Sequence, residues 1–211
     1  MVTPDSSAPV QLIAGLGNPG SEYARTRHNA GVWFVERLAE RHGALFRTEK
    51  KFFGRLSSIF VDGREVRLLL PDTYMNESGK SVGAVMNFFK LSPEHLLVAH
   101  DEIDFPCGKI RFKQGGGLAG HNGLRDISRS LAGATDFNRL RIGVGHPGER
   151  GKVTGHVLGK VSQADQEMID TCIDAAVQVL GPALQGNWQQ AMQDLHNMPQ
   201  PFTQNQNSDQ E

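Results

Sequence analysis

The sequence has little of what a covalently braced or metal-bound fold needs. Its 211 residues include two cysteines, Cys107 and Cys172, which are too few for a disulfide framework and lack the spacing of metal ligands. A chain of this length can bury a sizeable core without such braces. We therefore expect a fold held together by packing, in one compact domain or at most two small ones.

Long apolar runs are also missing. No uninterrupted apolar run approaches the ~20 residues that cross a bilayer. Mean hydropathy is −0.37, and apolar residues make up 38% of the chain. The N-terminus shows no basic segment followed by an apolar one, which argues against a secretory signal. The sequence thus predicts a soluble, cytoplasmic protein that does not associate with membranes.

Positive charge is absent from one part of the chain and concentrated in another. Residues 161–211 contain no Lys or Arg and seven Asp or Glu, whereas residues 105–160 contain ten Lys or Arg against three Asp or Glu. The net charge of the whole chain is only −1. Such an asymmetry is typical of a face that binds polyanions, although the same charges could simply be spread around the fold and solvate it.

The apolar pattern alternates between strand and helix periodicity. It predicts strands at 10–16, 53–61, 65–70, 96–99, 110–113 and 140–144, and helices at 31–42, 82–89, 124–131, 169–180 and 184–195. Asp62-Gly63 is a strong hairpin signal, so the sheet should be mixed. We expect a single α/β domain at residues 10–198, with a mixed β-sheet flanked by helices and two C-terminal helices. Residues 1–9 and 199–211 are polar and aperiodic, so disordered tails are expected there.

Two glycine-containing motifs suggest chemistry that their surroundings do not support. Residues 15–20 (GLGNPG) match the dinucleotide fingerprint, but residues 21–29 are polar where that motif needs a helix. Glu40, the acidic residue at the right distance, falls inside a predicted helix. Residues 79–83 (GKSVG) resemble both the end of a phosphate-binding loop and a nucleophile elbow. A phosphate-binding loop needs a further glycine five positions before Gly79, and that position is Tyr74. A nucleophile elbow needs its serine directly after a strand, whereas Ser81 opens a predicted helix.

The histidines and carboxylates do not form a metal-binding pattern. The eight histidines show no H-x-x-x-H pair, and residues 100–104 (HDEID) carry oxygen ligands in the wrong pattern for an EF-hand loop. We therefore expect no required metal.

Polar residues that are capable of acid–base chemistry remain in the predicted loops. They are Asn18, Tyr23, His28, Asn29, Tyr74, Met75, Asn76, Asp101, His121 and Asn122. The set lacks a credible serine or cysteine nucleophile and fits general-base activation of water. In that chemistry a neutral imidazole takes the proton, a carboxylate orients the imidazole, and amides hold the water and the oxyanion. His28 is the candidate base, although a lone histidine is more often structural.

Five long motifs follow one another from about residue 10 to residue 160. They are GLGNPGxEYxxTRHNxG at 15–31, TYMNxSG at 73–79, AHDEID at 99–104, FKxGGGLAGHNGL at 112–124 and RLRIGVGHPG at 139–148. Together they resemble the bacterial-type peptidyl-tRNA hydrolase family, which the C-terminal helices match only in character. The resemblance implies a monomeric α/β enzyme without a cofactor. Its expected reaction is hydrolysis of the ester between a peptide and the 3′ ribose of tRNA, which recycles peptidyl-tRNA that has dropped off ribosomes.

The resemblance also implies catalytic roles for individual residues. His28 resembles the family's catalytic base, and Asp101 resembles the carboxylate that orients it. Asn76 and Asn18 resemble the amides that hold the water and the reacting ester. Asn122 resembles an asparagine that positions the substrate.

A second group of residues is implied to bind the substrate, and Asn76 belongs to it as well. Tyr23, Tyr74 and Met75 would line the groove for the terminal adenosine and the peptide. Lys113 and Arg141, with Arg111 nearby, match basic positions that the family uses on the 5′ phosphate and acceptor stem of tRNA. The acidic C-terminal stretch argues against tRNA contacts from the last two helices.

Two other function classes stay open at this point. A non-catalytic tRNA- or RNA-binding module would use the same basic stretch, but it would not need the set of His28, Asn76 and Asp101. A nucleotide-dependent oxidoreductase is the third reading, and it requires a bound chromophore. The role of His121 is also open, because it could help to bind substrate or simply open a helix.

Overall fold

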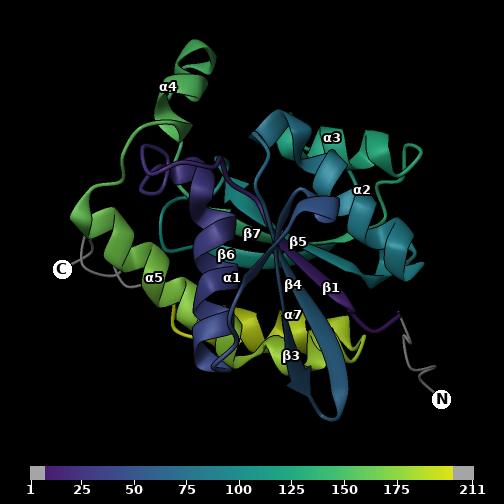
Figure 1. The fold of residues 1–211 in the computed structure, drawn as a ribbon. Helices are drawn as coiled ribbons and strands as arrows, with labels where there is room; N and C mark the ends of the chain where they lie inside the picture. Colours follow the sequence, from purple (N-terminus) through teal and green to yellow (C-terminus); the bar gives the residue numbers. More distant parts are fainter. Residues whose placement is uncertain (1–7, 202–211) are drawn as a thin grey trace.

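A computed structural model describes residues 8–201, so most of the two predicted tails lies outside the described residues. The chain forms a single α/β domain in which a mixed, seven-stranded sheet carries helices on both faces (Figure 1). The predicted fold class is confirmed. Within residues 8–201, no helix is both long enough and apolar enough to cross a membrane.

The sheet has the order β2-β3-β4-β1-β5-β7-β6. The strands are β1 (Leu12–Gly15), β2 (Arg47–Glu49), β3 (Gly54–Val61), β4 (Arg64–Pro71), β5 (Leu96–Glu102), β6 (Ile110–Gln114) and β7 (Asn138–Gly143). The helices are α1 (Ala30–Arg41), α2 (Ser78–Phe89), α3 (Asn122–Ser130), α4 (Val153–Val157), α5 (Gln163–Gln178), α6 (Leu180–Leu184) and α7 (Trp188–Asn197). Short 3-10 turns include η1 (Arg27–Asn29), η2 (Lys50–Phe52) and η3 (Met75–Glu77).

Alternation along the strands divides the core in two. On β1, Ile13 packs with the cluster that includes α1, α5 and α7, whereas Leu12 and Ala14 pack with the cluster that includes α2 and α3. Successive side chains of a strand point to opposite faces, so a central strand covered on both faces is apolar throughout. Strands β4, β1, β5 and β7 run parallel, and their carboxyl ends therefore meet at one edge of the sheet.

The predicted hairpin is present between β3 and β4. Its turn residues Asp62 and Gly63 both have positive φ, 51° and 76°, as a tight two-residue hairpin requires. Antiparallel pairing at β2-β3-β4 and at β6-β7 makes the sheet mixed.

Strand β5 continues further than predicted. The apolar pattern ends at Ala99, but the ladder with β7 continues through Asp101 opposite Ile142 and Glu102 opposite Gly143. The polar residues after Ala99 were expected in a loop, and that expectation is wrong because the register with β7 and buried partner side chains keep them in the strand. Strand β2 and helix α4 were not predicted at all.

The C-terminal region differs from prediction in two details. The second predicted helical segment is split into α6 and α7, with Gly186 at φ 84° between them. Gln200, expected in a disordered tail, is buried, and its side chain bonds the backbone N–H of Ile110 on β6 at 3.3 Å. Residues 202–211 of that tail lie outside the described residues.

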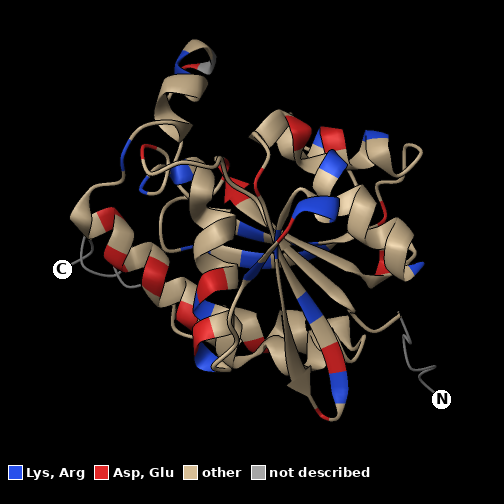
Figure 2. Ribbon diagram, viewed as in Figure 1, with Lys and Arg blue, Asp and Glu red and all other residues tan. Residues whose placement is uncertain are grey.

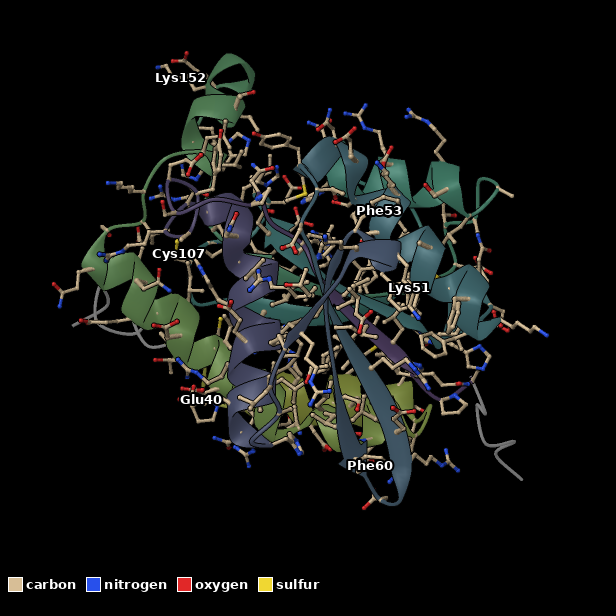
Figure 3. All side chains as sticks on the ribbon, viewed as in Figure 1. Glu40, Lys51, Phe53, Phe60, Cys107 and Lys152 are labelled. Carbon is tan, nitrogen blue, oxygen red and sulfur yellow. The ribbon has the colours of Figure 1, made fainter. Side chains whose placement is uncertain are left out.

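The structure around residues 15–20 does not fit a dinucleotide-binding site. No helix follows the turn directly, because residues 21–29 form turns and η1 before α1 begins at Ala30. Glu40 lies near the far end of α1, with its side chain largely exposed (Figure 3). The acidic residue therefore cannot serve a nucleotide held at that turn.

Candidate active site

A cleft of about 670 Å³ opens where β1 and β5 end. Seven predicted site residues line it: Asn18, His28, Tyr74, Met75, Asn76, Asp101 and Asn122. Further lining comes from His100, Glu102, Ile103, His121 and, on α4, Val153 and Val157. The cleft thus has a polar floor at the strand ends and an apolar wall under α4. Ligands of α/β sheets characteristically bind beyond the carboxyl ends of the strands.

His28 and Asp101 form the central pair of the floor. His28 lies in η1 just before α1, and its Nδ1 is 2.9 Å and 3.0 Å from the two carboxylate oxygens of Asp101. An ionised carboxylate only accepts hydrogen bonds, so Nδ1 carries the proton and donates. The other nitrogen, Nε2, is then the basic one on a ring that lines the cleft. This is the protonation state that a general base needs.

Asp101 is shared between two imidazole rings. It is 3% exposed, and its Oδ1 also lies 2.9 Å from Nε2 of His121. Burial alone would raise the pKa of the Asp101 carboxyl, but His28 and His121 hold that pKa well below its usual range. The carboxylate therefore stays ionised at neutral pH.

His121 has a structural role at the start of a helix and also contacts the active site. The sequence alone left open which of these applied. It precedes α3, and its Nδ1 accepts a bond from the backbone N–H of Leu124 at 3.4 Å, as an N-cap does. Because Nδ1 accepts, Nε2 carries the proton and donates to Asp101. His121 thus opens the helix and braces the carboxylate.

His100 lies beneath these groups and was missed in the sequence as a site residue. It is 1% exposed, its Nδ1 donates to the backbone carbonyl of Asp101 at 2.7 Å, and its ring meets that of His121 edge-on at 4.9 Å. Its Nε2 has no hydrogen-bond partner among residues 8–201. Burial lowers the pKa of His100 to about 3, so the ring is neutral under ordinary conditions.

Asn18 is held in place by two neighbouring segments. Its Oδ1 accepts the backbone N–H of Met75 at 2.7 Å. The Asn29 side chain bonds both the N–H of Asn18, at 2.9 Å, and its carbonyl, at 3.0 Å. Since the oxygen of the Asn18 amide is engaged, the Nδ2 group is the part left to donate toward the cleft.

Asn76 and Asn122 lie at the rim of the cleft. Asn76 is exposed on η3, and Asn122 is exposed at the start of α3. The Asn122 Oδ1 accepts a bond from Arg125 at 2.5 Å. Tyr23 lies outside the cleft but meets Tyr74, which lines it, edge-on with ring centres 6.5 Å apart. The two tyrosines extend the site onto the adjoining surface.

Basic side chains gather on one face of the β6-β7 pair. Arg111 lies opposite Arg141, and Lys113 lies opposite Arg139. Ile110 and Phe112 pack on the face of α5 and α7, so the intervening Arg111 and Lys113 project from the other face. Like charges directly opposite each other destabilise a sheet, which makes this concentration a candidate anion site. We call the side chains of Arg111, Lys113 and Arg141 the basic face.

Arg141 has a partner that the sequence did not suggest. Its Nε donates to the buried carboxylate of Glu102 at 2.8 Å, and its guanidinium lies 4.2 Å from the centre of the Phe105 ring. Glu102 in turn lines the cleft. Arg141 is therefore a bridge between the basic face and the cleft.

The acidic residues of the C-terminal region collect elsewhere. Figure 2 shows Asp and Glu along α5, which covers the opposite face of the sheet from Arg111 and Lys113. One of them, Asp165, pairs with Arg27 at 3.2 Å. The carboxylates of α5 thus lie on the face away from Arg111 and Lys113, and two of them, Asp165 and Asp174, pair with Arg27 and Arg37 there.

The floor of the cleft also contains the single group of metal-capable ligands found within residues 8–201. Ligand atoms of His28, Asp101 and His121 lie within 4.8 Å of one another. These atoms already satisfy each other, since both rings donate to the carboxylate. The donor set is complete as a hydrogen-bonded cluster, and an ion would have to displace both bonds.

Comparisons with known proteins agree with this geometry. The profile of the family described as peptidyl-tRNA hydrolase matches residues 12–205. A peptidyl-tRNA hydrolase of Azotobacter vinelandii is 54% identical over 89% of this chain and 96% of its own. One from Tolumonas auensis is 52% identical, over 89% and 95%. The crystal structure of the Acinetobacter baumannii peptidyl-tRNA hydrolase superposes with a TM-score of 0.86 at 50% identity, over 89% and 95%.

The chain belongs to the peptidyl-tRNA hydrolase family. The resemblance carried by the five motifs is thereby confirmed, and with it the hydrolase class. A binding module without catalysis and a nucleotide-dependent oxidoreductase both lose their support.

Some of the site residues that were not predicted from the sequence lie within the motifs of the peptidyl-tRNA hydrolase family, and others lie beyond them. His100 and Glu102 flank Asp101 within AHDEID, but three consecutive polar residues show no alternation of apolar and polar side chains that would indicate a strand. The apolar wall came from Val153 and Val157, whose i, i+4 spacing is a weak helical signal. Nothing in so short a stretch pointed to the cleft.

Proposed function

We propose that this chain hydrolyses the ester that joins a peptide to the 3′ ribose of tRNA, with His28 as the general base. The observation that carries the proposal is the His28–Asp101 pair, which leaves a basic Nε2 on a ring that lines a cleft rimmed by three asparagines. Family membership supplies the substrate class, because the matched relatives are named for it.

The reaction proceeds by direct attack of water. Nε2 of His28 takes a proton as the water oxygen bonds to the ester carbonyl carbon, and Asp101 stabilises the imidazolium that forms. The tetrahedral oxyanion collapses, the bond to the ribose 3′ oxygen breaks, and that oxygen receives the proton from His28. The products are tRNA with its 3′ hydroxyl restored and a peptide carboxylic acid, which loses its remaining proton to solvent and becomes the carboxylate. No covalent enzyme intermediate and no metal are required.

The asparagines supply the hydrogen bonds that this path needs. Nδ2 of Asn18 is the donor best held in place, because its amide oxygen is fixed on Met75. We assign Asn18 and Asn76 to the water and the reacting carbonyl, and Asn122 to positioning the substrate. A single donor to an oxyanion contributes roughly 10²–10³ in rate.

The substrate extends in two directions from the ester. The Tyr23–Tyr74 pair and Met75 line the groove for the terminal adenosine and the start of the peptide. The apolar wall under α4, with Ile103, Val153 and Val157, suits a peptide of varied sequence. Lys113, Arg111 and Arg141 bind phosphates of the acceptor stem and 5′ end. We further propose that the enzyme acts as a monomer in the cytoplasm.

The experiment is hydrolysis of N-acetylated aminoacyl-tRNA by wild type, His28→Ala and the control His196→Ala, with and without a chelator. His196 is exposed on α7, remote from the cleft. We expect chelator-insensitive cleavage by wild type and the control, and its loss in His28→Ala. Binding of tRNA by all three without any cleavage would instead support a binding module.

A further inference from the structure

Arg139 is a buried cation that opens the motif at residues 139–148, and neither the family resemblance nor the proposed chemistry gives it a role. It is 2% exposed on β7, and burial lowers the pKa of its guanidinium. No carboxylate within residues 8–201 forms a salt bridge with it, and its Nε has no hydrogen-bond partner there. The Glu102 carboxylate acts on Arg139 only through space. A buried cation without a directly paired carboxylate costs free energy, so the hydrogen bonds of Arg139 have to offset that cost.

Its side-chain hydrogen bonds all go to one loop, and its guanidinium also lies 6.0 Å from the centre of the Phe137 ring. Arg139 donates from Nη1 to the carbonyl of Gly117 at 2.6 Å, and from Nη2 to the carbonyls of Gly115 and Gly116, the latter at 3.0 Å. We call residues 115–120 the glycine loop. The planar fork of a guanidinium can serve several acceptors at once, which a lysine ammonium cannot reproduce with the same geometry.

The amino-acid composition of the glycine loop does little to restrict its backbone conformation. Its sequence is GGGLAG, and Gly115, Gly116, Ala119 and Gly120 all have positive φ. Glycine-rich segments lose more backbone entropy on ordering than other segments. An external anchor on three successive carbonyls therefore decides how well the loop is ordered.

The loop leads directly into the active site. Ala119 and Gly120 line the cleft, and the next two residues are His121, which braces Asp101, and Asn122. An error in the loop path would displace both side chains.

We propose that Arg139 is a positioning residue of this enzyme, which clamps the glycine loop so that His121 and Asn122 meet the substrate in a fixed arrangement. The inference rests on the proposed function. Arg139 touches no substrate in this proposal, and its almost complete burial distinguishes it from the half-buried Arg111, Lys113 and Arg141 beside it. The competing role is that of a fourth phosphate ligand alongside Lys113.

The test compares Arg139→Lys with Lys113→Gln, which removes a proposed phosphate ligand, and with Arg129→Gln. Arg129 is 80% exposed on α3 and serves as the inert control. Kinetics are measured on N-acetyl-aminoacyl-tRNA and on a short N-acetyl-aminoacyl nucleotide across a range of salt. Hydrogen exchange is followed at the backbone amide of His121, which donates to Leu118 at 2.9 Å. Thermal melting checks the fold of every variant.

We expect Arg139→Lys to lower kcat/KM roughly ten- to a hundredfold on both substrates, as small misplacements of catalytic groups do. Exchange at His121 should accelerate, and the salt dependence should match wild type. The proposal is overturned if Arg139→Lys has wild-type rates and exchange. It is also overturned if its loss is confined to full tRNA and its salt slope falls by about one, as for a lost phosphate contact. The exchange measurement needs no turnover, so it tests the clamp even if wild type proves not to cleave the ester.

Discussion

The cluster around Asp101 and the basic face of β6 and β7 are joined through Glu102, yet they are built in opposite ways. In the cluster, buried side chains satisfy one another at 2.9–3.0 Å and each proton has a defined place. On the basic face, like charges lie opposite each other, and within residues 8–201 Arg141 alone of the three pairs with a carboxylate, that of Glu102. Geometry should therefore govern the first region, and net charge with ionic strength the second.

Loss of the base should have the largest effect on catalysis. His28→Ala should lower kcat by roughly 10²–10⁴, the usual contribution of a general base, on full tRNA and on a short N-acetyl-aminoacyl nucleotide alike. Affinity for tRNA should be nearly unchanged, because His28 carries no phosphate contact in this account. Steady-state kinetics and a tRNA-binding titration check this. A folded variant with near wild-type kcat would remove His28 from the mechanism.

Asp101→Asn should have a smaller effect. The imidazole of His28 survives, but the amide cannot match a carboxylate as acceptor for two ring N–H groups or stabilise the imidazolium. We expect kcat to fall by less than about 10²-fold, with an altered pH profile. Rates measured from pH 5 to 9 test this, and an unchanged kcat and profile would show that Asp101 is not the partner of His28.

A change on the basic face should affect binding alone. Lys113→Gln should raise KM for full tRNA several-fold at low salt, with kcat unchanged, and should flatten the salt dependence by about one phosphate contact. The short nucleotide substrate should be processed as by wild type. Equal losses on both substrates would contradict the separation of the two regions.

The last effect concerns stability rather than rate. The pKa of His100 is lowered to about 3 in the folded protein, whereas the unfolded side chain titrates near its ordinary value of about 6.5. Between these values the unfolded state binds the additional proton. His100 should therefore reduce the free energy of unfolding by about 1.4 kcal/mol per pH unit as pH falls from 6.5 toward 3.

His100→Asn should remove this part of the pH dependence, while its amide can still donate to the Asp101 carbonyl. Denaturant unfolding at pH 7, 6, 5 and 4 measures it, with His196→Asn as the exposed control. Equal slopes for wild type and His100→Asn would show that His100 is not held neutral.

The contrast between the regions also explains what could be predicted from the sequence. Local patterns predicted the hairpin at Asp62-Gly63 and the helix at residues 31–42, which corresponds to α1. Turn chemistry and helical periodicity are properties of neighbouring residues, so a short stretch of sequence is enough to reveal them. The fold class followed from the alternation of such segments. The motifs brought His28, Asn76 and Asp101 to attention, and the structure places all three in one cleft.

What could not be predicted depends on distant partners. Asp101 stays inside β5 because His28, 73 positions away in the sequence, and His121, 20 away, bond its carboxylate. Glu102 is buried because Arg141, 39 positions away, pairs with it. The charge count did not distinguish Arg139 from the other cations of residues 105–160, whereas the structure buries it opposite Lys113 and against the glycine loop.

The most direct test of the account is the ratio of kcat/KM on full N-acetyl-aminoacyl-tRNA to that on the short nucleotide substrate, measured for His28→Ala and Lys113→Gln. We predict that His28→Ala leaves the ratio at its wild-type value while both rates collapse. Lys113→Gln should lower the ratio, with the short substrate unaffected. A changed ratio in His28→Ala, or an unchanged one in Lys113→Gln, would contradict the division between a catalytic centre and a phosphate-binding face.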